Sequence, residues 1–162
     1  MENLPYPLPD EENLICRDKS IVRRLYLPFR DEMVAISDAL YRAIITEKDY
    51  PRLSALFRRI ADEGLEHYRL LGRAITLLGG NPTLRVTIHP EAHHLTPENH
   101  PYTIDRLRRL LDTAIREKDA SCMQYEQLSA YPSETILPVL FCRLASDEAV
   151  HKQLLIEEID RL

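Results

Sequence analysis

The sequence predicts an all-α protein, an antiparallel four-helix bundle with one long crossover between its second and third helices. Apolar residues recur at every third or fourth position through four long segments, which is the period of a helix buried on one face. Strand-type alternation is confined to a few residues near 85–88. The first two segments and the last two are joined by short turns, whereas the connection over 80–101 is long enough to run the length of a bundle.

The chain is expected to form an N-terminal arm over 1–27 and a bundle over 28–162. Three prolines within the first nine residues prevent a helix at the start of the arm, although 18–27 could form a short one. The 162 residues suffice for one domain with its own core. Expected helix bounds are about 28–47, 51–79, 102–130 and 132–162.

Specific residues mark the ends of these helices. Pro51 suits a first helical turn. The pair Gly79-Gly80 followed by Pro82 is a stop signal for the second helix. The fourth helix is expected to tolerate Pro138 because it falls in the early turns, where the missing N–H costs little.

Composition and charge argue against several classes of protein. The net charge of −5 argues against a nucleic-acid binder. No apolar run reaches the length of about 18 residues that a membrane-spanning helix needs, and the acidic, proline-broken start is unlike a signal peptide. Three cysteines without a CxxC pair encode neither a zinc ribbon nor a rubredoxin-type iron site, and they fit a reducing cytoplasm. Cys122 and Cys142 fall on apolar helix faces and are expected in the core, with a redox role as the alternative.

Polar residues interrupt the apolar stripes at matching depths. They are Glu32, His67, Lys118, Glu148 and His151. Burying an unpaired carboxylate costs several kcal/mol, and a shared cation would satisfy the carboxylates and imidazoles together. Iron, manganese or zinc suits such a donor set. The alternative is that each residue lies on a partly exposed part of its helix.

The chain also contains two copies of one helical pattern, 84 residues apart when His67 and His151 are aligned (151 − 67 = 84). In the second copy Glu148 precedes His151 by three residues, so a helix places both on one face. Gly64 occupies the corresponding position of the first copy. A glycine inside a helix usually marks close packing or space for another group.

These features resemble the ferritin-like superfamily, in particular rubrerythrin, bacterioferritin-like and spore-coat-like proteins, over roughly 28–162. The stretches that carry the resemblance are 32–41, 59–72, 77–82 and 147–151. The resemblance implies two metal ions held by a Glu from each of helices one and three and an E-x-x-H motif from each of helices two and four. The matching positions are Glu32, His67, Glu148 and His151.

Two positions depart from the family pattern. Gly64 replaces the glutamate of helix two, and Lys118, seven residues before Tyr125, replaces that of helix three. Glu63 and Glu117 are possible substitutes, although a shift of one residue turns a helical side chain by about 100°. Because two carboxylates are lost and an ammonium is gained, we expect one ion or none rather than a di-iron centre.

Two functions follow as hypotheses. The first is a ferritin-like metal-binding protein with an altered di-metal site, which could serve an oxidoreductase acting on oxygen or peroxide; no catalytic residue is assigned. The alternative is a non-catalytic structural or interaction protein with a metal-free Glu–Lys–His core. Iron storage in a cage would need assembly surfaces that a sequence does not show. A cytoplasmic homodimer that pairs through helices one and two is expected by analogy with the family.

Two further groups of residues are candidates for a role. The crossover histidines are interpreted as part of a solvated loop, with a surface metal site as the alternative; they are His89, His93, His94 and His100. Tyr41, Tyr68 and Tyr125 are expected to line the bundle interior in a structural role.

Overall fold

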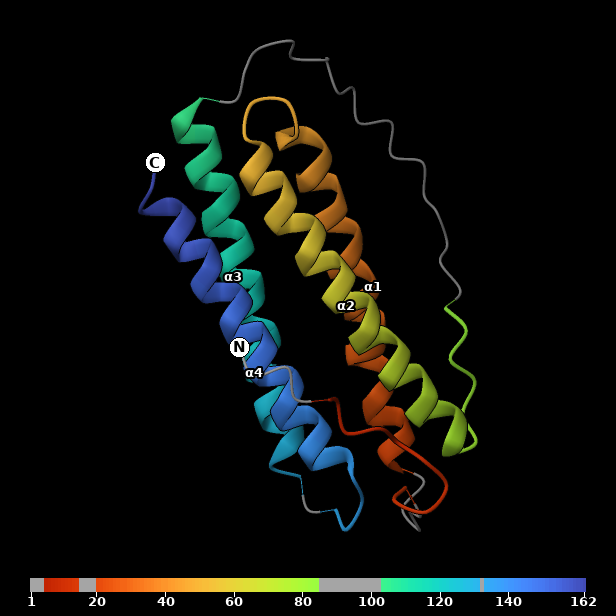
Figure 1. Ribbon diagram of the computed structural model, residues 1–162. Coiled ribbons are helices and arrows are strands. Elements are labelled where there is room, and N and C mark those ends of the chain that lie inside the picture. Colours follow the sequence, from red (N-terminus) through yellow and green to blue (C-terminus); the bar gives the residue numbers. More distant parts are fainter. Residues whose placement is uncertain (1–4, 15–19, 85–102, 132) are drawn as a thin grey trace.

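The computed structural model describes residues 5–14, 20–84, 103–131 and 133–162, and its described part is helical without a strand. The helices are α1 (Ser20–Thr46), α2 (Pro51–Leu77), α3 (Ile104–Ser129) and α4 (Leu137–Ile159). Helix α1 packs along α2, and α3 packs along α4, so two antiparallel hairpins lie side by side (Figure 1). This arrangement confirms the predicted all-α four-helix bundle.

Local signals explain where three of the helices begin or end. Pro51 lies in the first turn of α2, and Gly79 follows that helix with a φ of +82°, a conformation that favours glycine. Thr103 caps α3 by accepting a hydrogen bond from the Arg106 backbone N–H. Pro138 lies in the first turn of α4, as expected.

The expected start of the first helix at about Pro28 is wrong, because α1 begins at Ser20 and continues through that proline. A proline inside a helix removes a backbone hydrogen bond and costs about 3 kcal/mol. Here Leu25 and Phe29 are completely or almost completely buried on the same stretch, and their packing offsets this cost. Part of the segment expected to be arm is therefore a helix of the bundle.

The core consists of two apolar clusters at opposite ends of the bundle. The larger includes Leu25, Phe29, Leu71, Ile75, Leu140 and Phe141. The second includes Ala43, Phe57, Ile60, Leu107, Leu111 and Leu155. On every helix the polar residues that interrupt the apolar stripe lie in sequence between the members of the two clusters. The polar site therefore occupies the middle of the bundle.

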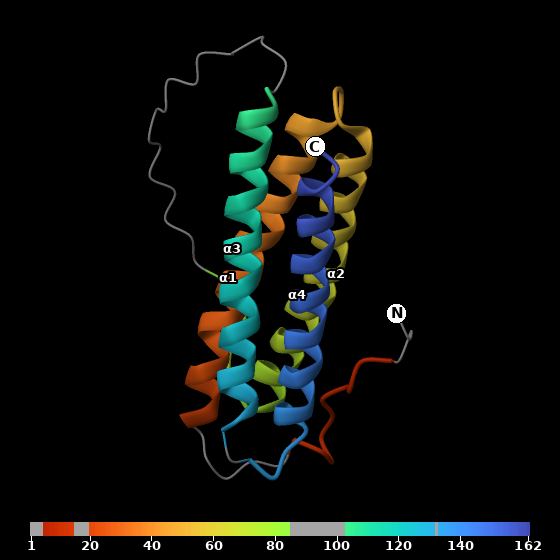
Figure 2. The same cartoon turned by 90° about the vertical axis from the view of Figure 1, so that its left-hand side faces the viewer.

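Residues 5–14, called the strap here, lie outside the helices on the side of α2 and α4 (Figures 1 and 2). Leu14 is buried in the larger cluster. The Arg73 Nε–H donates to the Pro9 carbonyl at 2.6 Å, and the Ile136 N–H donates to the Asn13 carbonyl at 3.0 Å. The proline-rich segment is thus fixed to the body of the protein.

Two expectations about buried residues are wrong. Tyr41 is 54% exposed, and Cys142 is also exposed, because both face outward on their helices. Cys122 is half-buried. None of the described helices combines the length and apolarity needed to cross a membrane. The four crossover histidines lie outside the described residues.

Candidate metal centre

Each of the four helices contributes a polar side chain to one buried site between the two clusters. Glu32 comes from α1, His67 from α2, Lys118 from α3, and Glu148 and His151 from α4. All five are buried, and His67, Glu148 and His151 have no exposed surface. The structure therefore brings together the polar residues that the sequence predicts at matching depths.

Glu32, His67 and Glu148 each offer a donor atom, and these three atoms lie within 4.8 Å of one another. His67 Nδ1 is 3.3 Å from Glu32 Oε1 and 3.7 Å from Glu148 Oε1. One imidazole nitrogen thus faces two carboxylates, an arrangement that a shared cation can bridge.

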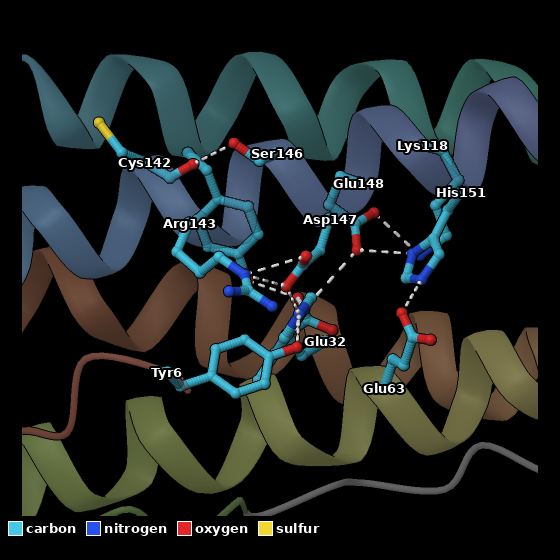
Figure 3. Close-up of polar contacts among 12 residues, drawn as sticks. Tyr6, Glu32, Glu63, Lys118, Cys142, Arg143, Ser146, Asp147, Glu148 and His151 are labelled. Carbon is cyan, nitrogen blue, oxygen red and sulfur yellow. Dashed lines mark hydrogen bonds and ion pairs between the residues drawn. The ribbon is translucent and has the colours of Figure 1, made fainter. Parts of the chain in front are cut away.

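The other nitrogen of His67 faces a carboxylate that sequence reasoning missed. His67 Nε2 is 3.3 Å from Asp147 Oδ2. Arg143 Nε donates to Asp147 Oδ1 at 3.1 Å (Figure 3). Once His67 is neutral, an N–H at Nε2 that donates to Asp147 leaves the Nδ1 lone pair free, which fixes the tautomer that a metal ligand needs.

His151 is oriented in a similar way by a carboxylate from the opposite hairpin. Its Nε2 is 2.7 Å from Glu63 Oε2, and its Nδ1 is 3.5 Å from Glu148 Oε1 (Figure 3). Glu63 and Asp147 are 84 residues apart (147 − 63 = 84). The internal repeat that relates His67 to His151 therefore also relates these two outer carboxylates, and it could have identified Asp147.

Lys118 fills the side of the site where the family resemblance places a carboxylate. Its Nζ is 2.9 Å from Glu148 Oε2. The neighbouring Glu117 instead forms an ion pair with Arg42, with an N–O distance of 2.6 Å, and its side chain is 43% exposed. Glu117 therefore does not substitute for the missing glutamate, and Lys118 faces the site as expected.

Gly64 allows close packing of α2 against α1 beside Glu32. A Cβ atom at position 64 would lie 3.4 Å from Glu32 Oε2 and 3.1 Å from Ile36 Cγ1. Glu63 does not reach Glu32 in place of a side chain at position 64, because its carboxylate contacts Arg59 and His151. Glu63 therefore does not take the place of the helix-two glutamate.

Two tyrosines contact the site from different elements, Tyr125 from α3 and Tyr6 from the strap, and Tyr68 packs in the apolar part of the bundle. The Tyr125 hydroxyl of α3 donates to Glu32 Oε1 at 2.5 Å, and burial together with the charge of Glu32 raises its pKa well above the usual value. Tyr68, half-buried, stacks on Phe29 with ring centroids 4.1 Å apart. The Tyr6 hydroxyl of the strap lies 3.4 Å from His67 Nε2, a contact absent from the sequence-based expectations.

The pKa values of His67 and Glu148 lie far from their usual ranges. Burial lowers the pKa of His67, but hydrogen bonds with Asp147 and Glu32 outweigh it and raise that pKa to about 9. Burial raises the pKa of Glu148, but the Lys118 ammonium and the two histidines outweigh it and lower that pKa to about 2. In the metal-free protein at neutral pH, His67 is therefore an imidazolium and Glu148 a carboxylate.

The donor set fits a transition metal by its chemistry and by its unsatisfied atoms. Within the described part of the chain, Glu32 Oε2, both Glu148 carboxylate oxygens and His151 Nδ1 are buried without a hydrogen bond, although Lys118 forms an ion pair with Glu148. Buried polar atoms are normally satisfied. A cation between Glu32, His67 and Glu148 would satisfy the free carboxylate oxygens, and oxygen and imidazole donors together suit iron, manganese or zinc.

Comparison with known proteins gives one match. The model of the rubrerythrin family matches residues 35–159. The matched region begins three residues after Glu32 and includes the other four polar residues of the site. No curated protein and no solved structure matches the chain.

Proposed function

We propose that this chain, which belongs to the rubrerythrin family, binds a single divalent transition-metal ion between Glu32, His67 and Glu148. The observation that carries the proposal is the approach of these three donor atoms to within 4.8 Å of one another in a fully buried site. His151 is a candidate fourth ligand, because its unsatisfied Nδ1 faces Glu148 from the other side.

Charge balance favours one ion over two. The Glu32 and Glu148 carboxylates offset the charge of one divalent ion, and the Lys118 ammonium is then the remaining positive charge of the interior. A second divalent ion would add two positive charges close to Lys118 with no further carboxylate beside it. Asp147 and Glu63 do not provide that charge, because each is already paired with an arginine.

Beyond metal binding, we propose a redox function in the cytoplasm. Iron or manganese would supply electron transfer to oxygen or peroxide when bound. The chain's own residues would hold the ion, exclude bulk water and keep Tyr125 hydrogen-bonded to Glu32. We also propose a homodimer through α1 and α2. The exposed large apolar side chains on α1 support it; they are Leu27, Val34, Leu40, Tyr41 and Ile44.

Metal analysis of the purified protein tests the proposal directly. The protein is prepared without chelator and then loaded separately with iron, manganese and zinc. Elemental analysis should find about one ion per chain. Glu32→Gln and His67→Gln should lose most of the bound ion. Glu117→Gln is the matched control and should retain it, because Glu117 points outward to Arg42.

The alternative is a protein whose metal-free polar core serves only structure or interaction. The specific observation in its favour is the 2.9 Å Lys118–Glu148 pair, which together with an imidazolium at His67 neutralises both carboxylates without an ion. Failure to retain iron, manganese or zinc even after loading would support this alternative and contradict the metal proposal.

A further inference from the structure

The strap carries one side chain onto the metal centre. Tyr6 is half-buried, and its ring meets the His67 ring edge-on with the centroids 5.9 Å apart. The Arg143 guanidinium lies 4.6 Å from the centroid of the Tyr6 ring, a cation–π contact. Figure 3 shows the Tyr6 hydroxyl directed at the Asp147 carboxylate and away from the strap backbone. Tyr6 therefore covers the outer side of the Asp147–His67 pair.

The α2–α4 side, which Tyr6 covers, also carries Glu63, the most exposed of the described carboxylates that contact the buried imidazoles. The side chains of Glu63 and Asp147 are 29% and 10% exposed, whereas those of His67, Glu148 and His151 are 0% exposed. Glu63, which is half-buried, and Asp147, which is buried, bridge α2 to α4 by contacting the buried imidazoles. A cation that follows negative charge inward would meet them before it reached Glu148.

The strap is fixed at points distant from Tyr6. Arg73 holds the Pro9 carbonyl, and Leu14 is buried in the larger apolar cluster. Tyr6 itself packs at the edge of the larger apolar cluster, beneath the Arg143 guanidinium. Its hydroxyl lies 3.4 Å from His67 Nε2 and interacts with the Asp147 carboxylate. The geometry thus combines backbone anchors farther along the strap with one side chain that lies over the site and can leave it without unfolding a helix.

We propose that Tyr6 is a gate on the α2–α4 side of the metal centre, and that the ion exchanges with solvent only when Tyr6 moves off the Asp147–His67 pair. This inference rests on the proposed metal function. A gate slows entry and exit alike, so it sets the rate of exchange and leaves the equilibrium affinity nearly unchanged. A residue that only supports the ligands would change the affinity.

Metal exchange kinetics test this proposal on the full chain. Zinc uptake and extraction by a chelator are followed by stopped flow in the wild type, Tyr6→Ala and Arg73→Ala. Tyr6→Ala should accelerate both steps by at least about tenfold, the equivalent of one lost cation–π contact and one hydrogen bond. Arg73→Ala should accelerate both steps less, because it loosens the strap without touching the site. The dissociation constant should change less than the rates.

Ser121→Trp is the matched control, because it fills the opposite side of the bundle. Ser121 lines an open groove of about 550 Å³ between α1 and α3, together with Glu117 and Ala35. Rates that are unchanged in Tyr6→Ala would overturn the proposal. Rates that are slowed by Ser121→Trp would place the route in that groove and would overturn it as well. A faster extraction with unchanged uptake would make Tyr6 a supporting residue and would also overturn it.

A metal-free measurement separates this inference from the proposed function. The chain has no tryptophan, so Tyr6→Trp creates a single fluorescent reporter on the strap. Its emission should be protected from iodide, and Arg73→Ala should increase quenching. A reporter quenched as strongly as free indole would contradict the gate whether or not metal binds. A protected reporter in a chain that retains no ion would contradict the proposed function instead.

Discussion

Lys118 Nζ lies 2.9 Å from Glu148 Oε2 in the bundle interior, where the Lys118 side chain is 9% exposed and that of Glu148 is fully buried. The pair joins α3 to α4 at the level of the metal centre. It gives the site a fixed positive charge at the position where the resemblance implies a carboxylate ligand. The pairing therefore affects both how strongly an ion binds and how many ions the site accepts.

Replacing this ammonium with an apolar side chain is expected to strengthen metal binding. Lys118→Met removes a positive charge that competes for Glu148, so the affinity for zinc should rise by at least about tenfold. Competition with a chelator measures the change. Lys152→Met is the control, since Lys152 pairs with Asp119 on the surface. An unchanged or lower affinity in Lys118→Met would show that the ammonium does not oppose the ion.

Restoring the two missing carboxylates is expected to restore a second metal. The double variant Gly64→Glu with Lys118→Glu should bind about two ions per chain, because it supplies the charge that a second divalent ion needs. Ile36 Cγ1 would be 3.1 Å from the new Cβ at position 64 and must shift slightly. Gly64→Ala with Lys118→Met changes the side chains without adding carboxylates and should not gain a second ion. Elemental analysis that finds one ion in both variants would contradict the charge argument.

Removing the charge of Glu148, the anionic partner of Lys118, is expected to destabilise the metal-free protein. Glu148→Gln leaves the buried Lys118 ammonium unpaired and should lower the free energy of unfolding by roughly 3 kcal/mol or more. Adding Lys118→Met to this variant should recover part of the loss, because no buried charge of the pair then remains. Urea denaturation in the presence of a chelator measures both changes. Additive losses in the double variant would mean that the two side chains are not coupled.

Local periodicity was sufficient to predict the polar core. The recurrence of apolar positions placed four polar residues on inward faces: Glu32, His67, Lys118 and Glu148. The structure confirms the burial of all four. Such predictions succeed because a helix fixes which residues share a face, and that depends only on nearby residues.

Contacts that depend on packing between distant segments could not be predicted from the sequence. Tyr6 reaches His67 because Arg73 and Leu14 fix the strap, and no periodic pattern encodes that path. Pro28 was expected to begin a helix because a proline inside a helix is unfavourable. The helix α1 nevertheless continues through Pro28, because burial of Leu25 and Phe29 offsets that cost. In both places tertiary packing outweighs the local preference.

Metal binding is expected to release a proton from His67. The pKa of about 9 means that the imidazole is protonated at neutral pH, and Nδ1 must lose its proton before it can bind an ion. Zinc affinity should therefore rise about tenfold per pH unit from pH 7 towards 9. Calorimetry in buffers of different ionisation enthalpy should detect about one proton released per ion at pH 7. Release of no proton would show that His67 is already neutral or is not a ligand.

The same imidazolium is expected to make the metal-free protein less stable as the pH rises. The folded-state pKa of His67, about 9, exceeds the ordinary value of 6.5, so the folded protein binds the proton more tightly than the unfolded chain. This stabilisation is complete below pH 6.5 and is lost as the pH rises from 6.5 to 9, for a change on the order of 3 kcal/mol. Urea denaturation at several pH values in the presence of a chelator measures it. His67→Gln should reduce the slope without abolishing it, because contacts with Glu148 and Glu63 also outweigh burial and raise the pKa of His151. A wild-type stability that stays constant or rises across this pH range would contradict an imidazolium at His67.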